Sequence, residues 1–350
     1  MDFKGEINYL RKKATKFLTS GLLDKRSVNL SDTSEIKRIL ITRPNHRLGN
    51  QLLITPLLKE VHEQFPDAHV DLFLKGNLGY MIFKNYEYVG DIICLPKSHF
   101  KKLGVYISCW IKLTFKTYDL VINAEASSSS GRLSTKIARA QHKFFGFERE
   151  LNIISTADAL HISKYPIYSL RYFLNQPLVA KPLPGLELKL SDAELTRGSS
   201  LIAPFINPDF STICLYTYAT GEKCFSTTWW QDLYEALQNQ FPDCNIIEAL
   251  PVENISAFDF KLPAFYSQNI RELASFIAQT TLFITGDCGI MHLAAATQTP
   301  TVGLFNVTSK EAYQPYNPGC LGIDTNQKLP KDICDTLKPH LEKIDFRIGS

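Results

Sequence analysis

Residues 282–296 read LFITGDCGIMHLAAA. The stretch begins with apolar and β-branched residues, which are typical of a buried strand, and Gly286 interrupts this run. A helical pattern of small and apolar residues follows at once, over 290–297. Buried strands that pass through a tight loop directly into a helix are the building units of a mostly parallel, doubly wound α/β sheet.

The same alternation extends from this stretch toward both ends of the chain. The first helix begins either with Asn50 as its cap or with Thr55 as its cap and Pro56 in the first helical position. The other expected strands lie at 38–42, 69–74, 90–95, 118–123, 212–216, 245–248 and 301–305, and helices at 228–241 and 270–279.

A proline-rich segment, 176–185, divides this pattern into two series of strands and helices. The chain has 350 residues, about twice the usual length of one domain. We therefore predict two doubly wound α/β domains. In such sheets ligands bind at the carboxyl ends of the strands, here at a cleft between the halves.

The composition is that of a globular protein, with 45% hydrophobic and 21% charged residues. Apolar runs stay far below the ~20 residues of a membrane-spanning helix. A net charge of +3 is too small to favour nucleic acid as a partner. The eight cysteines form no C-x-x-C pair, which argues against zinc or a disulfide framework. We expect a reduced, cytoplasmic location.

The N-terminal 26 residues are basic, with leucine and phenylalanine between the lysines and arginines. They contain no unbroken apolar core and no small-residue cleavage site, so a secretory signal is not predicted. Two interpretations stay open. The segment is either a solvated helix with one apolar stripe packed on the protein, or a basic amphipathic helix on an anionic membrane surface.

The loop between the strand and helix of 282–296 has the features of a phosphate site. The first amides of a helix carry partial positive charge, and Gly286 and Gly289 allow close approach of a diphosphate. Asp287 either braces this loop or caps the helix. The alternative is a helix that simply packs tightly on its sheet. His292 is either a packed, hydrogen-bonded residue or an acid or base.

A second polar loop, 216–230, follows the first strand of the second half. Ser226, Thr227 or Thr228 caps the next helix. Lys223 either sets a cation beside a diphosphate or is an ordinary solvated lysine.

The corresponding loop of the first half, 42–51, reads TRPNHRLGNQ. Arg43, His46 and Arg47 bring positive charge that suits an acidic acceptor or a phosphate. Only Gly49 is present, so a nicotinamide-binding G-x-G-x-x-G loop is absent. The chain also lacks a P-loop and a G-x-S-x-G elbow, which excludes P-loop kinases and hydrolases of that type.

Taken together, these segments resemble glycosyltransferase family 9, the heptosyltransferase-like enzymes of bacterial lipopolysaccharide assembly, from about Arg38 to Tyr316. The first loop is similar to the family's R-x-x-x-x-G-D and T-P pattern, here Arg43 to Asn50 and then Thr55-Pro56. The segments 118–122 and 144–147 look like its fourth strand and a later glycine. Residues 286–294 look like its D-S/T-G-x-x-H-x-A donor motif, and 299–305 like the strand after it.

The resemblance implies a GT-B fold, with two Rossmann-like domains facing each other across a cleft. The domains that it implies are a basic helical extension at 1–35, an acceptor domain at 36–180, a donor domain at 181–330, and a C-terminal helix at 331–350 that packs back on the first domain.

The resemblance also implies the activity, an inverting, metal-independent transfer of a heptose-like sugar to a lipopolysaccharide-core or related glycan acceptor. ADP-heptose is the favoured donor, a co-substrate and not a cofactor, and UDP- or GDP-sugars remain open. The chain has no D-x-D motif, which suits a transferase that uses protein cations. A lipid-linked acceptor implies peripheral contact with the cytoplasmic face of the inner membrane.

The family pattern assigns residues to three roles. The donor residues that it implies are Thr220, Glu222, Lys223, Asp287, Cys288, Gly289 and His292. The acceptor residues are Arg43, Arg47, Glu125 and Ser127. The candidate catalytic residues are Asn50, His46 and Lys223.

Two positions depart from the family pattern. Asn50 stands where the family has the aspartate thought to be the base, and an amide cannot take up a proton at neutral pH. His46 and Glu125 are the candidate replacements. Asn306 replaces a glycine after the last strand of the motif. Two alternatives follow: a non-catalytic protein that binds nucleotide sugars or glycans, and a nucleotide-sugar epimerase.

Overall fold

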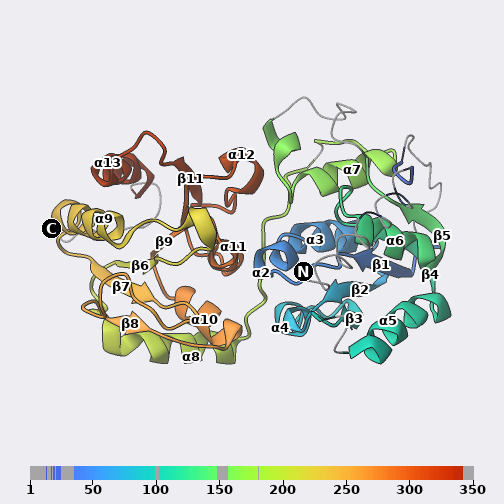
Figure 1. The fold of residues 1–350 in the computed structure, drawn as a ribbon, viewed down its shortest axis with the longest axis horizontal. Coiled ribbons are helices and arrows are strands. Elements are labelled where there is room, and N and C mark those ends of the chain that lie inside the picture. Colours follow the sequence, from blue (N-terminus) through green and yellow to red (C-terminus); the bar gives the residue numbers. More distant parts are fainter. Residues whose placement is uncertain are drawn as a thin grey trace, which may run out of the picture. The chain divides into compact units, whose positions relative to one another are not determined.

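Two parallel β-sheets, one in each half of the chain, organise the fold (Figure 1). The chain divides into two compact units, Met1–Pro184 and Gly185–Ser350. The structure, a computed structural model, describes residues 13, 17, 19, 21–24, 35–98, 102–147, 157–179 and 181–341. The predicted mixed α/β class with parallel sheets is confirmed.

The first unit contains a five-stranded parallel sheet in the order β3-β2-β1-β4-β5. Its strands are β1 (Arg38–Thr42), β2 (His69–Lys75), β3 (Val89–Leu95), β4 (Thr117–Asn123) and β5 (Arg139–Phe144). Its helices are α2 (Leu48–Leu52), α3 (Thr55–Gln64), α4 (Leu78–Ile82), α5 (Leu103–Phe115), α6 (Ser129–Ile137) and α7 (Tyr165–Phe173), with a 3₁₀ turn η4 at Ala157–Leu160.

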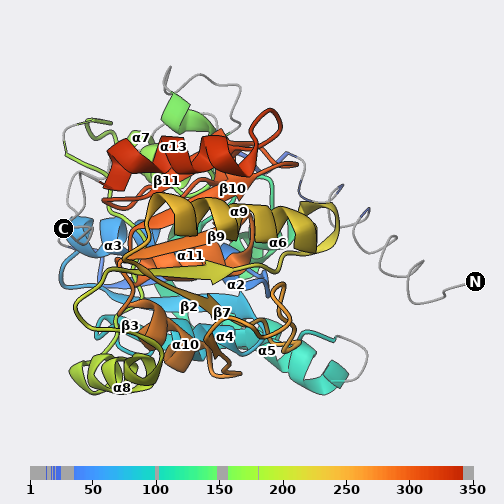
Figure 2. The same cartoon turned by 90° about the vertical axis from the view of Figure 1, so that its left-hand side faces the viewer.

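The centre of this sheet is covered on both faces. Ile39, Leu40 and Ile41 of β1 are consecutive and all fully buried, as expected for a central parallel strand. α5 packs against α6, and α3 packs against α7. Figures 1 and 2 place α5 and α7 on opposite sides of the sheet.

Neither predicted cap of the first helix is confirmed, because the segment forms two separate helices and the N-cap residue of α3 is Ile54. Asn50 lies inside the short helix α2, and α3 begins at Thr55 with Pro56 in its first turn. Asn50 is therefore not a cap, because the chain already turns into α2 after Arg47.

The second unit contains a six-stranded parallel sheet in the order β11-β10-β9-β6-β7-β8. Its strands are β6 (Thr212–Tyr216), β7 (Asn245–Ala249), β8 (Ala264–Phe265), β9 (Leu282–Gly286), β10 (Thr301–Phe305) and β11 (Leu321–Asp324). Its helices are α8 (Asp192–Ile202), α9 (Thr227–Gln240), α10 (Ile270–Ile277), α11 (Gly289–Ala296), α12 (Lys310–Tyr313) and α13 (Pro330–Leu341), with 3₁₀ turns η5 (Ala203–Phe205) and η6 (Gly221–Lys223).

Helices cover both faces of this sheet as well. α9 and α13 lie on one side and α8 and α10 on the other (Figures 1 and 2). Leu233 and Leu237 of α9 and Ile333 and Leu337 of α13 are fully buried in one core cluster. As far as Leu341, the C-terminal helix thus belongs to the core of the second unit, and its packing on the first unit stays a prediction.

Buried polar side chains hold the chain on either side of the proline-rich segment. In the first unit, Arg171 pairs with Glu60 at 2.8 Å and also donates to the carbonyl of Leu178 at 2.8 Å. In the second unit, Asn317 accepts a hydrogen bond from the Leu186 amide at 2.9 Å and donates to its carbonyl at 2.8 Å. Each unit therefore fixes its own end of this segment.

The ion pair between Glu194 of α8 and Arg271 of α10 makes the stability of the second unit dependent on pH. Arg271 is buried and donates to Glu194 at 2.7 Å, which lowers the pKa of Glu194 from 4.5 to about 2. A depressed carboxyl pKa contributes stability that is present above pH 4.5 and is lost as the pH falls toward 2. We expect Glu194→Gln to lower the free energy of unfolding at pH 7, and the difference from wild type to vanish toward pH 2.

Denaturant unfolding of both proteins between pH 2 and 7 measures this difference. Glu235→Gln, which removes an exposed carboxylate from α9, is the matched control and should track wild type throughout. A gap between wild type and Glu194→Gln that stays constant with pH would contradict the assignment.

Within the described part of the chain, no helix combines the length and apolar character needed to cross a membrane. The predicted basic extension at 1–35 lies almost entirely outside the described residues, so both interpretations of it stay predictions.

Candidate functional site

A lysine, an aspartate and a threonine meet at the carboxyl end of the second sheet. Asp287 directly follows β9, and its carboxylate is buried. Lys223, from the loop after β6, donates through Nζ to Oδ2 of Asp287. Thr308, from the loop after β10, donates to the same oxygen. Because β6, β9 and β10 are parallel neighbours, the three loops leave the sheet at one edge.

The loop that carries Lys223 is shaped by its backbone. Gly221 has φ +65, a left-handed conformation that favours glycine, and it opens the 3₁₀ turn η6. The side-chain amide of Asn306 donates to the carbonyl of Glu222 at 3.3 Å. Ser226 then caps α9 by accepting from the Trp229 amide at 3.1 Å, as one of the predicted caps. The turn is thus tied at both ends, with Lys223 between them.

The N-terminus of α11 lies next to this group. Cys288 is the N-cap residue, and its side chain makes no capping hydrogen bond. Asp287 therefore braces the loop, one of its two predicted roles, and does not cap the helix. Burial raises the pKa of the Cys288 thiol, so this side chain stays neutral. Because a thiol is a weak acceptor, the first-turn amides of α11, from Gly289 onward, retain their capacity to bind an anion.

The other predicted donor residues are placed differently. Thr220 and Glu222 are exposed on the turn before Lys223. His292 is buried in α11, which agrees with a packed residue better than with an exposed acid or base. Whether these residues contact a nucleotide sugar stays a prediction.

Sequence reasoning missed two residues of this region. One sequence feature could have indicated Thr308 as a site residue, namely its position in the polar stretch just after β10. Glu248, in the buried strand β7, accepts from the Thr217 hydroxyl at 2.9 Å and from the Ala257 amide at 3.1 Å. Burial raises the pKa of this carboxyl group. Glu248 joins two loops at the carboxyl edge of the sheet. The sequence signal that could have identified it is a single acidic residue within an apolar stretch.

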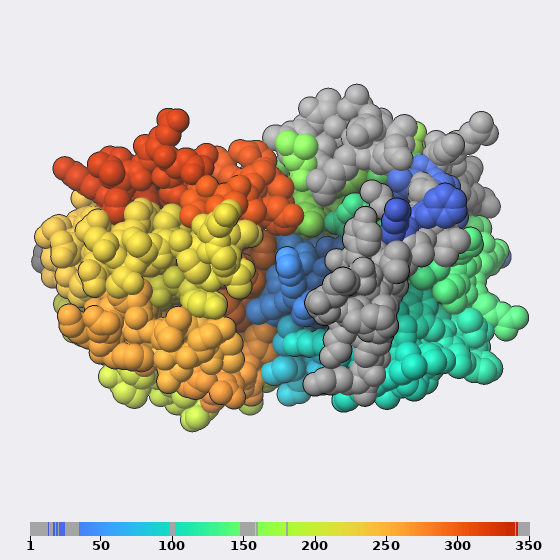
Figure 3. Space-filling model, in the orientation of Figure 1, coloured from blue at the N-terminus to red at the C-terminus, as the bar shows by residue number. Residues whose placement is uncertain are grey.

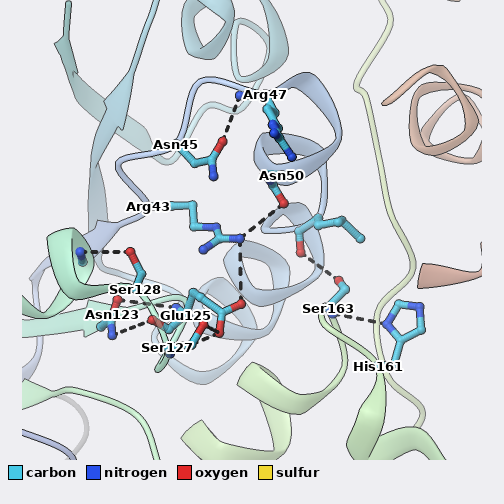
Figure 4. A network of polar contacts seen from close by, with 12 residues as sticks. Arg43, Asn45, Arg47, Asn50, Asn123, Glu125, Ser127, Ser128, His161 and Ser163 are labelled. Atoms are coloured by element: carbon cyan, nitrogen blue, oxygen red, sulfur yellow. Dashed lines mark hydrogen bonds and ion pairs between the residues drawn. The ribbon is translucent and has the colours of Figure 1, made fainter. Parts of the chain in front are cut away.

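In the first unit, Arg43 joins two of the predicted site residues (Figure 4). Arg43 directly follows β1, and Glu125 follows the neighbouring parallel strand β4. The Nη2 atom of Arg43 donates to Oδ1 of Asn50 at 3.3 Å and lies 3.8 Å from Oε2 of Glu125. Both charged side chains are largely buried. The guanidinium group of Arg43 therefore lies between the carboxylate of Glu125 and the side-chain amide of Asn50.

A second set of hydrogen bonds fixes the loop that carries Glu125. Ser127, which is exposed, donates to Oε1 of Glu125 from its hydroxyl at 2.8 Å and from its amide at 3.2 Å. Asn123, at the end of β4, donates to the carbonyls of Glu125 and Phe145 at 2.9 and 2.8 Å. Sequence reasoning missed Asn123, although a polar residue at the end of a buried strand is a recognisable signal.

Gly146, the later glycine of the family resemblance, supports the same loop. Its φ is +91, and a Cβ atom at this position would lie 2.8 Å from the Cβ of Ala126. Only glycine fits here without strain, next to the residue that follows Glu125.

His46 lies beside the loop that follows β2. It is exposed, and its Cβ approaches the backbone at Gly76. Desolvation of the ring lowers the pKa of His46, and the charges of Lys75, Lys97 and Arg47 lower it further. The imidazole is therefore neutral at pH 7. Arg47 is exposed, and its amide donates to the Asn45 side chain at 2.9 Å.

Among the described residues, no three histidine, cysteine, aspartate or glutamate side chains gather in a way that could hold a metal ion.

The sequence of residues 267–336 matches the model of Glycosyltransferase family 9 (heptosyltransferase). No curated protein matches the chain in sequence. The matched segment contains Asp287, α11 and Thr308, so it includes much of the polar edge described above.

Solved structures extend the similarity over most of the chain. A glycosyl transferase family 9 protein from Veillonella parvula has a TM-score of 0.68 and 16% identity, over 89% of this chain and 91% of that one. E. coli heptosyltransferase WaaC with ADP has a TM-score of 0.64 and 14% identity, over 87% and 99%. E. coli ADP-heptose lps heptosyltransferase II has a TM-score of 0.62 and 15% identity, over 88% and 99%.

At these identities the structural likeness establishes the fold, which is the GT-B type of these glycosyltransferases. The family match over 267–336 adds support for a glycosyltransferase. The resemblance to glycosyltransferase family 9 (heptosyltransferase) is thus confirmed.

Proposed function

We propose that this protein is an inverting glycosyltransferase that moves a heptose-like sugar from a nucleotide-sugar donor to a lipopolysaccharide-core or related glycan acceptor. The observation that carries the proposal is the contact of Lys223 and Thr308 with Asp287 beside the N-terminus of α11. This arrangement combines an ammonium and helix amides, the groups that bind a diphosphate.

ADP-heptose is the donor that we propose. Two similar structures support this choice, WaaC with ADP and WaaC with ADP-2-deoxy-2-fluoro heptose. In our proposal the diphosphate lies between Lys223 and the first amides of α11. An ammonium has three N–H donors, and the contact with Asp287 uses one of them. Asp287 thereby positions Lys223, and the remaining donors face the diphosphate.

Transfer proceeds by a single displacement in this proposal. The acceptor hydroxyl oxygen forms a bond to the anomeric carbon, and the bond from that carbon to the diphosphate oxygen breaks with its electron pair. The hydroxyl proton passes to a base of the protein. Lys223 and the α11 amides stabilise the negative charge that develops on the leaving nucleoside diphosphate, without a requirement for a metal ion.

We assign the base to Glu125 in preference to His46. Glu125 shares Arg43 with Asn50, the position where the family has its aspartate, whereas His46 is exposed among Lys75, Lys97 and Arg47. A proton taken up by His46 would add a further positive charge to that cluster, which is unfavourable. Asn50 then acts as a hydrogen-bonding residue, and Arg43, Arg47 and Ser127 contribute to acceptor binding.

The test is the release of nucleoside diphosphate from ADP-heptose in the presence of a heptose-deficient lipopolysaccharide acceptor. We expect release that requires both substrates, and NMR of the product should show an inverted anomeric configuration. UDP- and GDP-sugars are the matched comparison donors. If neither ADP, UDP nor GDP binds by calorimetry, the proposed donor site is wrong.

Asn50 supports a second candidate function, a non-catalytic protein that binds nucleotide sugars or glycans. An amide at this position cannot act as a base, and it is engaged by Arg43. Calorimetric binding of ADP-heptose without turnover for any acceptor would favour this candidate. Conversion of the donor to an epimer with no acceptor present would instead indicate the nucleotide-sugar epimerase alternative.

A further inference from the structure

Helix α5 carries an exposed apolar stripe along its whole length. Leu103, Ile107, Ile111 and Phe115 recur every fourth residue, so they lie on one side of the helix. Their side chains are 46–77% exposed. Isolated exposed apolar residues are common on protein surfaces, but four in a row on one helix form a continuous patch.

The opposite side of α5 is already used for packing on the sheet. Cys109 and Leu113 are buried in a core cluster with Leu40 of β1, and Trp110 contacts Phe73 edge to face at 5.3 Å between ring centroids. The exposed stripe is therefore a second apolar face, which the packing of the first unit does not require. In the space-filling view this part of the chain lies at the surface of the first unit (Figure 3).

A hollow beside the helix, lined by both apolar and charged residues, adjoins this stripe. It has a volume of about 720 Å³ and lies between α5 and β3, which is an edge strand of the sheet. Ile92, Val105 and Phe115 contribute to its lining, and Lys112 lies at the same hollow.

The charge on α5 and in the segment just before it is basic. Residues 92–118 contain no aspartate or glutamate, and their five lysines are Lys97, Lys101, Lys102, Lys112 and Lys116. Lys116 is neutralised by Asp71 and Asp91. Lys97, Lys102 and Lys112 are exposed.

We propose that α5 docks the first unit on an anionic lipid surface. The apolar stripe enters the boundary between headgroups and acyl chains, and the lysines meet the lipid phosphates. With 13 residues, α5 is about 20 Å long, too short to cross a bilayer but suited to lie in its surface. A protein partner would be expected to meet a patch with fewer lysines, since charged residues are depleted at the centre of protein interfaces.

Docking at α5 would also serve the proposed function. Only this link to the acceptor depends on the proposed function. α5 leaves the carboxyl end of β3, and Arg43 and Glu125 lie at the carboxyl ends of the parallel strands β1 and β4. The first turn of α5 and the acceptor residues thus share one edge of the sheet. A lipid-linked acceptor would be met at that edge.

The test is flotation of the full chain with vesicles of phosphatidylglycerol and phosphatidylethanolamine, with phosphatidylcholine vesicles as the neutral comparison. We expect binding to the anionic vesicles that weakens with added salt. The variant Ile107→Ser/Ile111→Ser/Phe115→Ser should lower the partition coefficient at least about tenfold. Lys112→Gln should lower it about fivefold.

The matched control is Leu160→Ser/Val179→Ser/Leu329→Ser, which removes three equally exposed apolar side chains elsewhere in the chain. It should bind as wild type does, and circular dichroism should show that both triple variants are folded. The basic N-terminal residues are tested separately with Lys12→Gln/Lys13→Gln/Lys16→Gln. Binding that survives the α5 triple variant but is lost in this N-terminal variant would overturn the proposal.

A second readout locates the contact. Lipids with brominated acyl chains quench only tryptophans close to them, and Trp110 lies on α5 whereas Trp229 and Trp230 lie on α9 of the second unit. We expect Trp110→Phe to remove most of the quenching. Equal quenching in wild type and Trp110→Phe would contradict docking through α5.

If wild type binds no vesicles but forms a dimer that the α5 triple variant abolishes, the stripe binds a second copy of the chain and the proposal is wrong. None of these readouts depends on sugar transfer.

Discussion

Replacing Lys223 by alanine should reduce kcat/KM for sugar transfer by about 10²–10³-fold, the range typical for the loss of one charge-stabilising donor. The reason lies in the contact of Lys223 with Asp287, which holds the ammonium at the end of β9 next to α11. Without the ammonium, the leaving diphosphate loses its cation, and the buried carboxylate of Asp287 keeps the Thr308 contact but loses its cationic partner. Steady-state kinetics measures the loss of transfer activity, and calorimetry with ADP measures the loss of diphosphate affinity.

Two further variants separate charge from folding. Lys331→Ala, which removes an exposed lysine at the start of α13, should leave both transfer and ADP affinity unchanged. Asp287→Asn keeps Lys223 but frees it from its partner, so we expect intermediate activity. If Lys223→Ala binds ADP and turns over as wild type does, Lys223 is an ordinary loop lysine and the diphosphate site lies elsewhere.

Replacing Glu125 by glutamine should reduce kcat by about 10²–10⁴-fold, the contribution usual for a general base, and leave the affinity for ADP unchanged. Glutamine preserves the shape of the side chain and its contacts with Ser127, but it cannot take up the acceptor proton. The expected result is a loss confined to the transfer step, which single-turnover measurements separate from donor binding.

Variants at the two neighbouring candidates distinguish the alternatives. His46→Gln should retain most activity, because His46 lies among the cations Lys75, Lys97 and Arg47. Asn50→Asp restores the carboxylate of the family pattern and should recover part of the activity in the Glu125→Gln background. A Glu125→Gln enzyme with full kcat, together with an inactive His46→Gln enzyme, would move the base to His46.

The regular elements of the fold could be read from local pattern. Buried strands such as β1, β6, β9 and β10 are largely apolar runs, and helices such as α9 have a cap and a 3.6-residue period. Some of the elements missed had a weak local signal. β5 reads RAQHKF with no alternation, and β8 has only two residues. α5 was missed because apolar residues lie on both its exposed and its buried sides, which weakens the period of its apolar pattern.

In the candidate sites, too, some features could be predicted from local sequence and others could not. By itself the sequence determined that both halves are parallel α/β units, that the loops after their first strands carry Arg43 and Lys223, and that Gly286 to His292 follows a family donor pattern. Only the tertiary structure decided which of these side chains meet: Lys223 with Asp287 and Thr308, and Arg43 with Asn50 and Glu125. The physical reason is that strand order and loop path, which no local pattern encodes, bring the ends of neighbouring parallel strands to one edge of a sheet and set the partners of each charge there.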